Sequence, residues 1–390
     1  MKKAVLKPGK EVSLLRKHPW VFSGAIQELD DAYIGDWVQV FDSRDRLLGT
    51  GQVGDGSIAI RMIAFEAIEP NVEFWKSKLQ NCLNLRQHLG FGPATPTNAY
   101  RLVHGEGDNL PGLIIDIYND CAVIQAHSLG MYNSLNDIAE ALEQLESLQL
   151  KTIYNKSAAA MHGTVGEDGF LLGDTPETIA QENGLQFKVN WVTGQKTGFF
   201  LDQRDNRNLL RQFSKGKTVL NTFCYTGGFS VAALAGGASK VVSADISNTA
   251  INLANENVAL MKLKKGQTHE GIAVDVMKSL SEDTEQFDIV VLDPPAFTKS
   301  RDAIESAMRG YKEINLRALK LLRPGGLLMT FSCSGGVSAD LFQKIIAGAA
   351  LDAGADARII ERLGPGLDHP IALNFPEGDY LKGLVCRVPD

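Results

Sequence analysis

The sequence lacks the patterns that mark a membrane-spanning, secreted or metal-binding protein. No run of about 18 apolar residues occurs, and the opening stretch "MKKAVLKPGKEVSLLRKHPW" has no signal-peptide core. The five cysteines, an odd number, form no Cys-x-x-Cys pair and no Cys/His cluster. We therefore expect a soluble cytoplasmic protein with no membrane contact, no disulfide framework and no bound metal.

Positive charge is also scarce, because 39 Lys and Arg face 46 Asp and Glu. This balance argues against broad nucleic-acid binding, which needs local positive charge. Two stretches have a net positive charge instead. Residues 1–20 hold six Lys or Arg and one acid, a net of 6 − 1 = +5, and residues 299–323 hold seven and three, a net of 7 − 3 = +4. Local basic patches on an acidic chain suit a selectively held polyanion.

A length of 390 residues exceeds one typical domain of roughly 100–200 residues. Residues 1–71 carry short β-like runs such as "DWVQVFD" and predict a small β-barrel. Residues 72–190 begin with a helical pattern and continue with strands and a helix, which predicts a compact α+β middle domain. Residues 191–390 alternate strand, glycine turn and helix, with seven strands, and predict a doubly wound, mostly parallel α/β sheet.

The first strand of this α/β region runs into "NTFCYTGGFS", which is not the Gly-x-Gly-x-x-Gly dinucleotide fingerprint. Gly227 and Gly228 allow a tight turn before a helix. Asp245 ends the second strand, where a carboxylate can accept the ribose hydroxyls, and Asp275 ends the third, near an adenine edge. Helix caps are the alternative role of both acids. S-adenosylmethionine fits best, because it needs a ribose acceptor but no phosphate cradle.

The next two strand ends carry groups suited to a reaction. In "VVLDPPAFTKS", Asp293 precedes Pro294 and Pro295, whose rigid backbone makes a lip for a planar substrate. In "TFSCSGG", Cys333 ends the neighbouring strand, so it and Asp293 are expected to face one substrate. A Pro-terminated strand end and a buried strand cysteine are the alternatives.

Several motifs together carry a family resemblance. "TGQKTGFFLDQRDNR", "VLNTFCYTGGFS", "LDPPAFTKS" and "FSCSGG" resemble the cofactor and catalytic motifs of class I methyltransferases. "LLRKHPWVFSGAI" resembles the start of an RNA-binding PUA domain, and "YRLVHGEGDNLPGLIIDIY" the start of the middle domain that follows it. Nearly the whole chain is thus similar to the bacterial 23S ribosomal RNA methyltransferases of the large-subunit methyltransferase I type, which form 5-methylcytosine.

The resemblance implies a seven-stranded Rossmann-like methyltransferase sheet after a PUA-like barrel, with ribosomal RNA as partner. It implies that the Cys333 thiolate adds to C6 of cytosine and that Asp293 binds the base. The implied cofactor contacts are Phe200, Asp202, Gln203, Phe223, Tyr225, Thr226, Gly227, Asp245, Ile246, Asp275, Val276 and Asp293. The implied RNA contacts are Lys10, Arg16, Lys17, Trp20, Pro294, Pro295 and Lys299.

Some positions leave alternatives open. Some RNA cytosine methyltransferases carry a second cysteine where this chain has Ala296, so a one-cysteine mechanism is implied. Methylation of an exocyclic amino group is the rival activity, and a non-catalytic RNA-binding or assembly protein is the rival class. Trp20 suits core packing as well as base stacking. The oligomeric state, a homodimer included, stays open.

Overall fold

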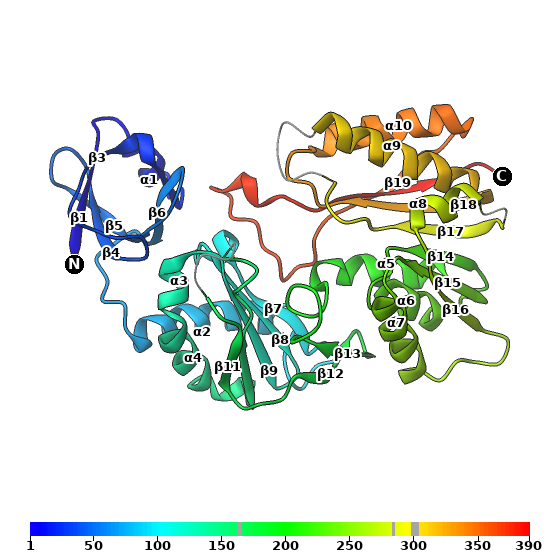
Figure 1. The fold of residues 1–390 in the computed structure, drawn as a ribbon, viewed down its shortest axis with the longest axis horizontal. Coiled ribbons are helices and arrows are strands. Elements are labelled where there is room, and N and C mark those ends of the chain that lie inside the picture. The colour runs from blue at the N-terminus through cyan, green and yellow to red at the C-terminus, as the bar shows by residue number, and fades with distance from the viewer. Residues whose placement is uncertain (162–165, 283–284, 298–303) are drawn as a thin grey trace. The chain divides into compact units, whose positions relative to one another are not determined.

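The computed structural model describes residues 1–161, 166–282, 285–297 and 304–390 (Figure 1). The chain forms two compact units. Unit 1 comprises Met1–Gln181, Val189–Leu201 and Leu367–Gly378, and unit 2 comprises Glu182–Lys188, Asp202–Gly366 and Asp379–Asp390. The segment Leu367–Gly378 therefore belongs to unit 1, although the residues on both sides of it in the sequence belong to unit 2. Within the described ranges, no helix is long and apolar enough to cross a membrane.

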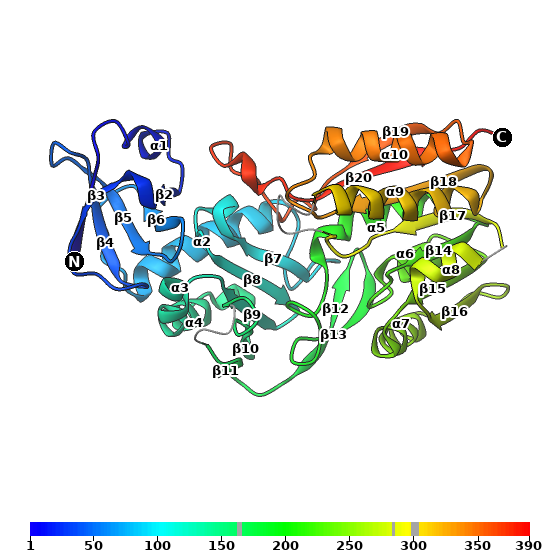
Figure 2. The ribbon, with the colours of Figure 1, turned by 45° about the horizontal axis from the view of Figure 1, so that its top comes forward.

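The N-terminal part of unit 1 is a six-stranded sheet (Figure 2). Its strand order is β2-β6-β5-β4-β1-β3. Its strands are β1 (Lys2–Leu6), β2 (Trp20–Phe22), β3 (Ile26–Leu29), β4 (Trp37–Phe41), β5 (Leu47–Val53) and β6 (Ile58–Ala64), with the short helix α1 (Val12–Leu15). Alternate side chains such as Val38 and Val40 are fully buried, as the period of two in "DWVQVFD" predicts. This part confirms the predicted small β domain.

The remainder of unit 1 is an α+β region, in which helices accompany one five-stranded sheet. Helix α2 (Val72–His88) begins at Asn71, whose side chain accepts a hydrogen bond from the Phe74 N–H, as expected of an N-cap. A five-stranded sheet follows in the order β11-β10-β9-β8-β7. Its elements are β7 (Ala99–His104), β8 (Leu113–Tyr118), β9 (Cys121–Ala126), α3 (Leu129–Asn133), α4 (Leu135–Glu143), β10 (Thr152–Asn155) and β11 (Gly169–Leu172). The hairpin of β12 (Glu177–Glu182) and β13 (Leu185–Asn190) follows, and its turn and most of β13 belong to unit 2.

Unit 2 contains the predicted seven-stranded sheet, in the order β16-β15-β14-β17-β18-β20-β19. Six strands run in one direction, and β20 is antiparallel to both of its neighbours, β18 and β19. The strands are β14 (Thr218–Thr222), β15 (Lys240–Asp245), β16 (Thr268–Ala273), β17 (Phe287–Leu292), β18 (Leu322–Ser332), β19 (Arg358–Leu363) and β20 (Lys382–Arg387). Strand β17 is buried along almost its whole length, as parallel strands covered on both faces are.

Helices cover both faces of this sheet, with α9 and α10 on one face and α6 and α7 on the other (Figure 1). They are α5 (Arg204–Phe213), α6 (Gly228–Ala235), α7 (Asn248–Leu260), α8 (Val276–Glu282), α9 (Ile304–Lys320) and α10 (Ala339–Ala353). Local signals set the bounds of α10: Ser338 caps its first turn, and Gly354 ends it with a φ of +67°. The predicted α/β class is confirmed.

A buried ion pair holds the start of α5. The Arg207 guanidinium donates to both carboxylate oxygens of Glu182, at 2.7 and 2.5 Å, and the two side chains are 4% and 2% exposed. Its aliphatic stem also fills the space beside Gly228, where an added Cβ would lie 3.0 Å from the Arg207 Cδ. Removal of one partner of such a pair leaves a buried charge without its counterion.

We predict that Arg207→Met lowers the stability of unit 2 by about 3–5 kcal/mol, because Glu182 stays buried without its partner. Arg207→Met combined with Glu182→Leu should recover much of this loss. Lys344→Met is the matched control, since Lys344 pairs with Asp340 at the exposed surface and its loss should cost less than about 1 kcal/mol. Chemical denaturation checks all three variants. An Arg207→Met variant as stable as Lys344→Met would contradict the prediction.

Candidate active site

The predicted site residues gather at one edge of the unit 2 sheet. Strands β14, β15, β16, β17 and β18 are parallel neighbours, so their carboxyl ends lie at the same edge. Asp245 is the last residue of β15, Asp293 directly follows β17, and Cys333 directly follows β18. The third predicted strand differs slightly, because β16 begins earlier than "GIAVD" and ends two residues before Asp275. Ligands of open α/β sheets bind at such an edge.

The turn between β14 and α6 has a strained backbone. Phe223 and Tyr225 have φ values of +52° and +43°, which side-chain-bearing residues rarely adopt, and Gly227 has +74°. Thr226 is buried, and its carbonyl accepts a hydrogen bond from the Asn257 amide at 2.9 Å. Strained residues of this kind cost about 1–3 kcal/mol each and concentrate at functional sites. The turn therefore has the geometry expected of a ligand-binding loop.

Asp245 ties this turn to the end of β15. One carboxylate oxygen accepts the Tyr225 N–H at 3.0 Å and the other the Ser247 N–H at 2.9 Å. A carboxylate has about four acceptor positions, so capacity remains for hydroxyl donors. The next side chain, Ile246, is 74% exposed, an apolar surface beside the acid.

Asp275 and Val276 lie at the start of α8. The Asp275 side chain accepts the Lys278 N–H at 3.2 Å, which is the contact of a helix cap, and its side chain is exposed. Val276 is 3% exposed and belongs to the core. The structure thus shows the capping role of Asp275 that the sequence left open, and its adenine contact stays a prediction.

Asp293 is oriented by a chain of buried amides. The Gln203 amide donates to Asp293 Oδ1 at 3.0 Å, and the Asn206 amide donates to Gln203 Oε1 at 2.6 Å. Gln203 and Asn206 are both 3% exposed. Sequence reasoning assigned Gln203 to the cofactor and missed both its contact with Asp293 and the part of Asn206. The only sequence signal is that both residues lie in the motif "FFLDQRDNR".

Asp202 has a buried carboxylate oxygen. Its Oδ2 accepts the Tyr380 hydroxyl at 2.7 Å, and its main-chain carbonyl accepts the Gly366 N–H. Its Oδ1 is buried, and no residue in the described part of the chain donates to it. Buried acceptors are normally satisfied, so this oxygen calls for a donor from outside the described residues, such as a bound ligand.

Cys333 is the cysteine that remains accessible. Cys82, Cys121, Cys224 and Cys386 are buried, whereas Cys333 is partly exposed. Burial raises the pKa of Cys82 and Cys121 to about 12 and that of Cys386 to about 11, so these thiols stay protonated.

The side chains directly before and after Cys333 point into the protein interior. Ser332 and Ser334 are fully buried, and the Ser334 hydroxyl lies 2.9 Å from the Tyr311 hydroxyl. Because successive side chains at a strand end point to opposite faces, two buried serines leave the cysteine on the accessible face.

The remaining predicted contacts divide between the two units. Lys10, Arg16 and Lys17 are exposed on the N-terminal sheet domain. Trp20 packs against Phe375 with ring centroids 4.7 Å apart, and its indole N–H donates to Glu106 at 2.9 Å, contacts that favour packing. Pro294 is buried and Pro295 exposed, Phe200 lies in unit 1, and Lys299 lies outside the described residues.

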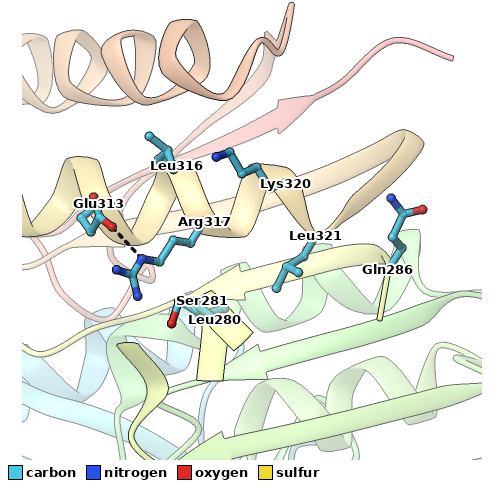
Figure 3. Close-up of a pocket in the computed structure, with 8 residues that line it drawn as sticks. All are labelled: Leu280, Ser281, Gln286, Glu313, Leu316, Arg317, Lys320 and Leu321. Carbon is cyan, nitrogen blue, oxygen red and sulfur yellow. Dashed lines mark hydrogen bonds and ion pairs between the residues drawn. The ribbon is translucent and has the colours of Figure 1, made fainter. Parts of the chain in front are cut away.

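A separate pocket of unit 2 lies at the opposite edge of the sheet (Figure 3). Gln286 and Leu321 precede β17 and β18, so this pocket is at the amino ends of these strands. It is lined by Leu280, Ser281, Gln286, Glu313, Leu316, Arg317, Lys320 and Leu321, and none of these is a predicted site residue. In the pocket lining, the Arg317 Nε–H donates to Glu313 Oε1 at 2.7 Å.

The comparisons with known proteins agree with this geometry. The S-adenosylmethionine-dependent methyltransferase family matches residues 109–384, and a PUA-like domain family matches residues 4–65. Proteins named ribosomal RNA large subunit methyltransferase I are 43% identical in Tolumonas auensis and 40% identical in Yersinia pestis, each over 98% of both chains. The chain belongs to the S-adenosylmethionine-dependent methyltransferase family, and within it to the ribosomal RNA large subunit methyltransferase I group. A Streptococcus mutans structure described as a methyltransferase shares the fold, with a TM-score of 0.84, 24% identity and 100% coverage of both chains.

The residues at the sheet edge fit S-adenosylmethionine, the cofactor of this methyltransferase family. The buried Asp202 Oδ1 would accept the ammonium of its amino acid, and Asp245 would accept its ribose hydroxyls. The exposed Ile246 would cover one face of the adenine. In the described part of the chain, no group of three or more His, Cys, Asp and Glu side chains could hold a metal ion.

We predict that Gly227→Ala weakens cofactor binding at least about tenfold, because the added Cβ would lie 2.8 Å from the Ala254 Cβ at a φ of +74°. Calorimetric titration with S-adenosylhomocysteine measures the effect. Gly216→Ala is the matched control. Gly216 lies before β14 and has a φ of +72°, and its added Cβ would have no atom of the described ranges within 4 Å. Equal affinities of the two variants would contradict the role of the turn.

We also predict that Asp245→Ala weakens cofactor binding by about tenfold or more, since a charged acceptor of hydrogen bonds is lost. Asp340→Ala, which removes an exposed acid from the first turn of α10, should bind normally. The same titration serves both variants. An unchanged affinity of Asp245→Ala would remove Asp245 from the ribose-binding role.

Proposed function

We propose that this methyltransferase forms 5-methylcytosine in ribosomal RNA of the large subunit, with Cys333 as its nucleophile. The observation that carries the proposal is the accessible thiol of Cys333 at the strand end next to Asp293, while the other four cysteines are buried. The names of the relatives from Tolumonas auensis and Yersinia pestis support ribosomal RNA as the substrate.

The chemistry of cytosine explains the need for a thiol. C5 of cytosine is too weak a nucleophile to attack a methyl sulfonium. When the Cys333 thiolate forms a bond to C6, electron density moves to C5, which becomes enamine-like. S-adenosylmethionine, when bound, supplies the electrophilic methyl group for C5. The C5 proton then passes to solvent, its bonding electrons re-form the C5–C6 double bond, and the Cys333 sulfur leaves as a thiolate, which restores the aromatic ring.

Asp293 is suited to hold the base during this addition. Its carboxyl group, in the protonated form, would donate a hydrogen bond to N3 of cytosine, where negative charge develops on addition at C6, and would accept one from the N4 amino group. The Gln203 amide fixes the rotation of this carboxyl group through the 3.0 Å hydrogen bond to Oδ1. A preorganised carboxyl group of this kind loses little conformational freedom when the substrate binds.

The surroundings leave room for a base turned out of its stack. A Cβ added at Gly335 would meet no atom of the described residues within 4 Å, so these residues leave space beside Cys333. The exposed Pro295 adds a rigid lip at the neighbouring strand end. Enzymes that modify a base bring it out of the stack into such a pocket. The exposed Lys10, Arg16 and Lys17 would contact RNA phosphates on the N-terminal domain.

The rival activity, methylation of an exocyclic amino group, would require an aromatic ring stacked on the base directly after the two prolines. Ala296 occupies that position. Phe297, one residue later, packs on Tyr311 with ring centroids 4.6 Å apart. The nearest aromatic ring is therefore committed to the packing of α9, which favours the cysteine mechanism.

Cys333→Ala should abolish methyl transfer and leave S-adenosylhomocysteine binding near that of the wild type. Cys82→Ala is the control, because Cys82 is buried in unit 1 and should have no part in the chemistry. Transfer of radiolabelled methyl groups to ribosomal RNA measures activity, and calorimetry measures binding. Full activity of Cys333→Ala would eliminate the thiolate mechanism.

The base specificity is tested by nucleoside mass spectrometry of large-subunit ribosomal RNA from cells with and without the gene. The proposal expects one 5-methylcytosine to disappear with the gene and to return when the wild-type gene, but not the Cys333→Ala variant, is restored. Unchanged 5-methylcytosine together with the loss of another methylated nucleoside would replace the cytosine assignment.

A further inference from the structure

Two buried side chains hold the loop that carries Cys333. This loop joins β18 to α10. Lys382, the first residue of β20, donates from its Nζ to the carbonyls of Ser334 at 2.8 Å and Val337 at 2.6 Å. On the other side, the Tyr311 hydroxyl of α9 lies 2.9 Å from the Ser334 hydroxyl. The residues just after Cys333 are thus anchored from two different elements.

Lys382 is an unusual residue for its position. Strand β20 is buried along nearly all its length, and the strand register places Lys382 directly opposite Ser332, next to Cys333. The lysine is only 9% exposed. Burial of an ammonium costs several kcal/mol unless nearby groups stabilise it. A buried lysine that precedes four apolar, buried strand residues, Gly383 to Cys386, therefore points to a specific role.

The charges around Lys382 indicate what that role is. Burial lowers the pKa of Lys382, and the negative charges of Asp379 and of an ionised Cys333 act against this effect. Interaction between opposite charges is mutual, so the ammonium favours the thiolate as much as the thiolate favours the ammonium. On the α9 side, Tyr311 is held neutral because burial raises its pKa. Asp293, at the adjacent strand end, is a further acid, so among Asp293, Asp379, Tyr311 and Lys382 the positive charge comes from Lys382.

We propose that Lys382 is a positioning residue of the reaction, whose ammonium stabilises the Cys333 thiolate while its two hydrogen bonds hold the nucleophile loop. This inference rests on the proposed function, which requires a thiolate but identified no group that favours one. A free thiol with a pKa of roughly 8.5 is mostly protonated at neutral pH.

The protons balance in either starting state. When Lys382 is charged, the thiol proton of Cys333 goes to solvent. When Lys382 is neutral, the thiol proton again goes to solvent and the amine takes up a proton from solvent. Both routes end in the same thiolate beside an ammonium, and the two groups titrate as a coupled pair. The thiolate then forms the bond to C6, and it is regenerated when the sulfur leaves.

The test is the pH dependence of alkylation of Cys333 by iodoacetamide, followed by peptide mass spectrometry on the full chain without RNA. Lys382→Met should raise the apparent pKa of Cys333 by about one unit or more, so that alkylation at pH 7 slows about tenfold. Lys382→Gln should give the same shift, since it retains a donor but no charge, and it serves if the methionine variant does not fold. Cofactor binding and thermal unfolding report folding.

Tyr311→Phe is the matched control, because it removes the other anchor of the loop without changing its charge. Its alkylation profile should stay at that of the wild type. In methyl transfer, Lys382→Met should lose activity at pH 7 and regain part of it at higher pH, where the thiol ionises by itself. A merely structural role of Lys382 would not produce recovery with pH.

Two outcomes would overturn the inference. One is a folded Lys382→Met or Lys382→Gln variant whose alkylation profile matches the wild type, and the other is an equal shift in Tyr311→Phe. The alkylation needs neither RNA nor methyl transfer. Failure of the proposed function, seen as full activity of Cys333→Ala, is therefore distinguishable from failure of the role of Lys382.

Discussion

The register between β17 and β18 is the constraint on which the site depends. Leu292 pairs with Thr330 in parallel orientation, so Asp293 and the end of β18 lie at the same edge of the sheet. Because side chains alternate along a strand, a slip of one residue would bury Cys333 and turn a serine outward. The full burial of Ser332 and Ser334 opposes such a slip, since their places lie in the packed interior.

Buried polar side chains hold the loops at these strand ends. Gln203 orients Asp293, Asp245 accepts two main-chain N–H groups around the glycine turn, and Lys382 bonds the carbonyls beyond Cys333. Loops need such contacts because their main-chain groups have no partners in a helix or sheet. Each contact also comes from a different element of unit 2. The site is therefore rigid because several elements pack together, and no single motif makes it so.

In unit 1, buried ion pairs hold segments of the chain together in a similar way. Arg86 pairs with Asp108 at 2.6 Å, with both side chains almost fully buried, and Arg101 pairs with Asp116 at 2.8 Å. Both arginines also bind the segment that the sequence places between β19 and β20: Arg86 donates to the Asp368 carbonyl, and the Arg101 main-chain N–H to the Asp368 carboxylate. A stretch within the C-terminal third of the chain thus completes a domain built from the first half.

The sequence by itself determined the elements and the order in which they occur. The seven strands, the glycine turn after β14 and the positions of Asp293 and Cys333 at strand ends were predictable, because strand periodicity and turn residues act over a few neighbouring residues. Only the tertiary structure decided which cysteine is accessible and what Asp293 and Cys333 contact. Gln203 reaches Asp293 across 90 positions of the sequence, and Lys382 reaches Ser334 across 48. Contacts at such separations depend on strand register and helix packing, which no local pattern encodes.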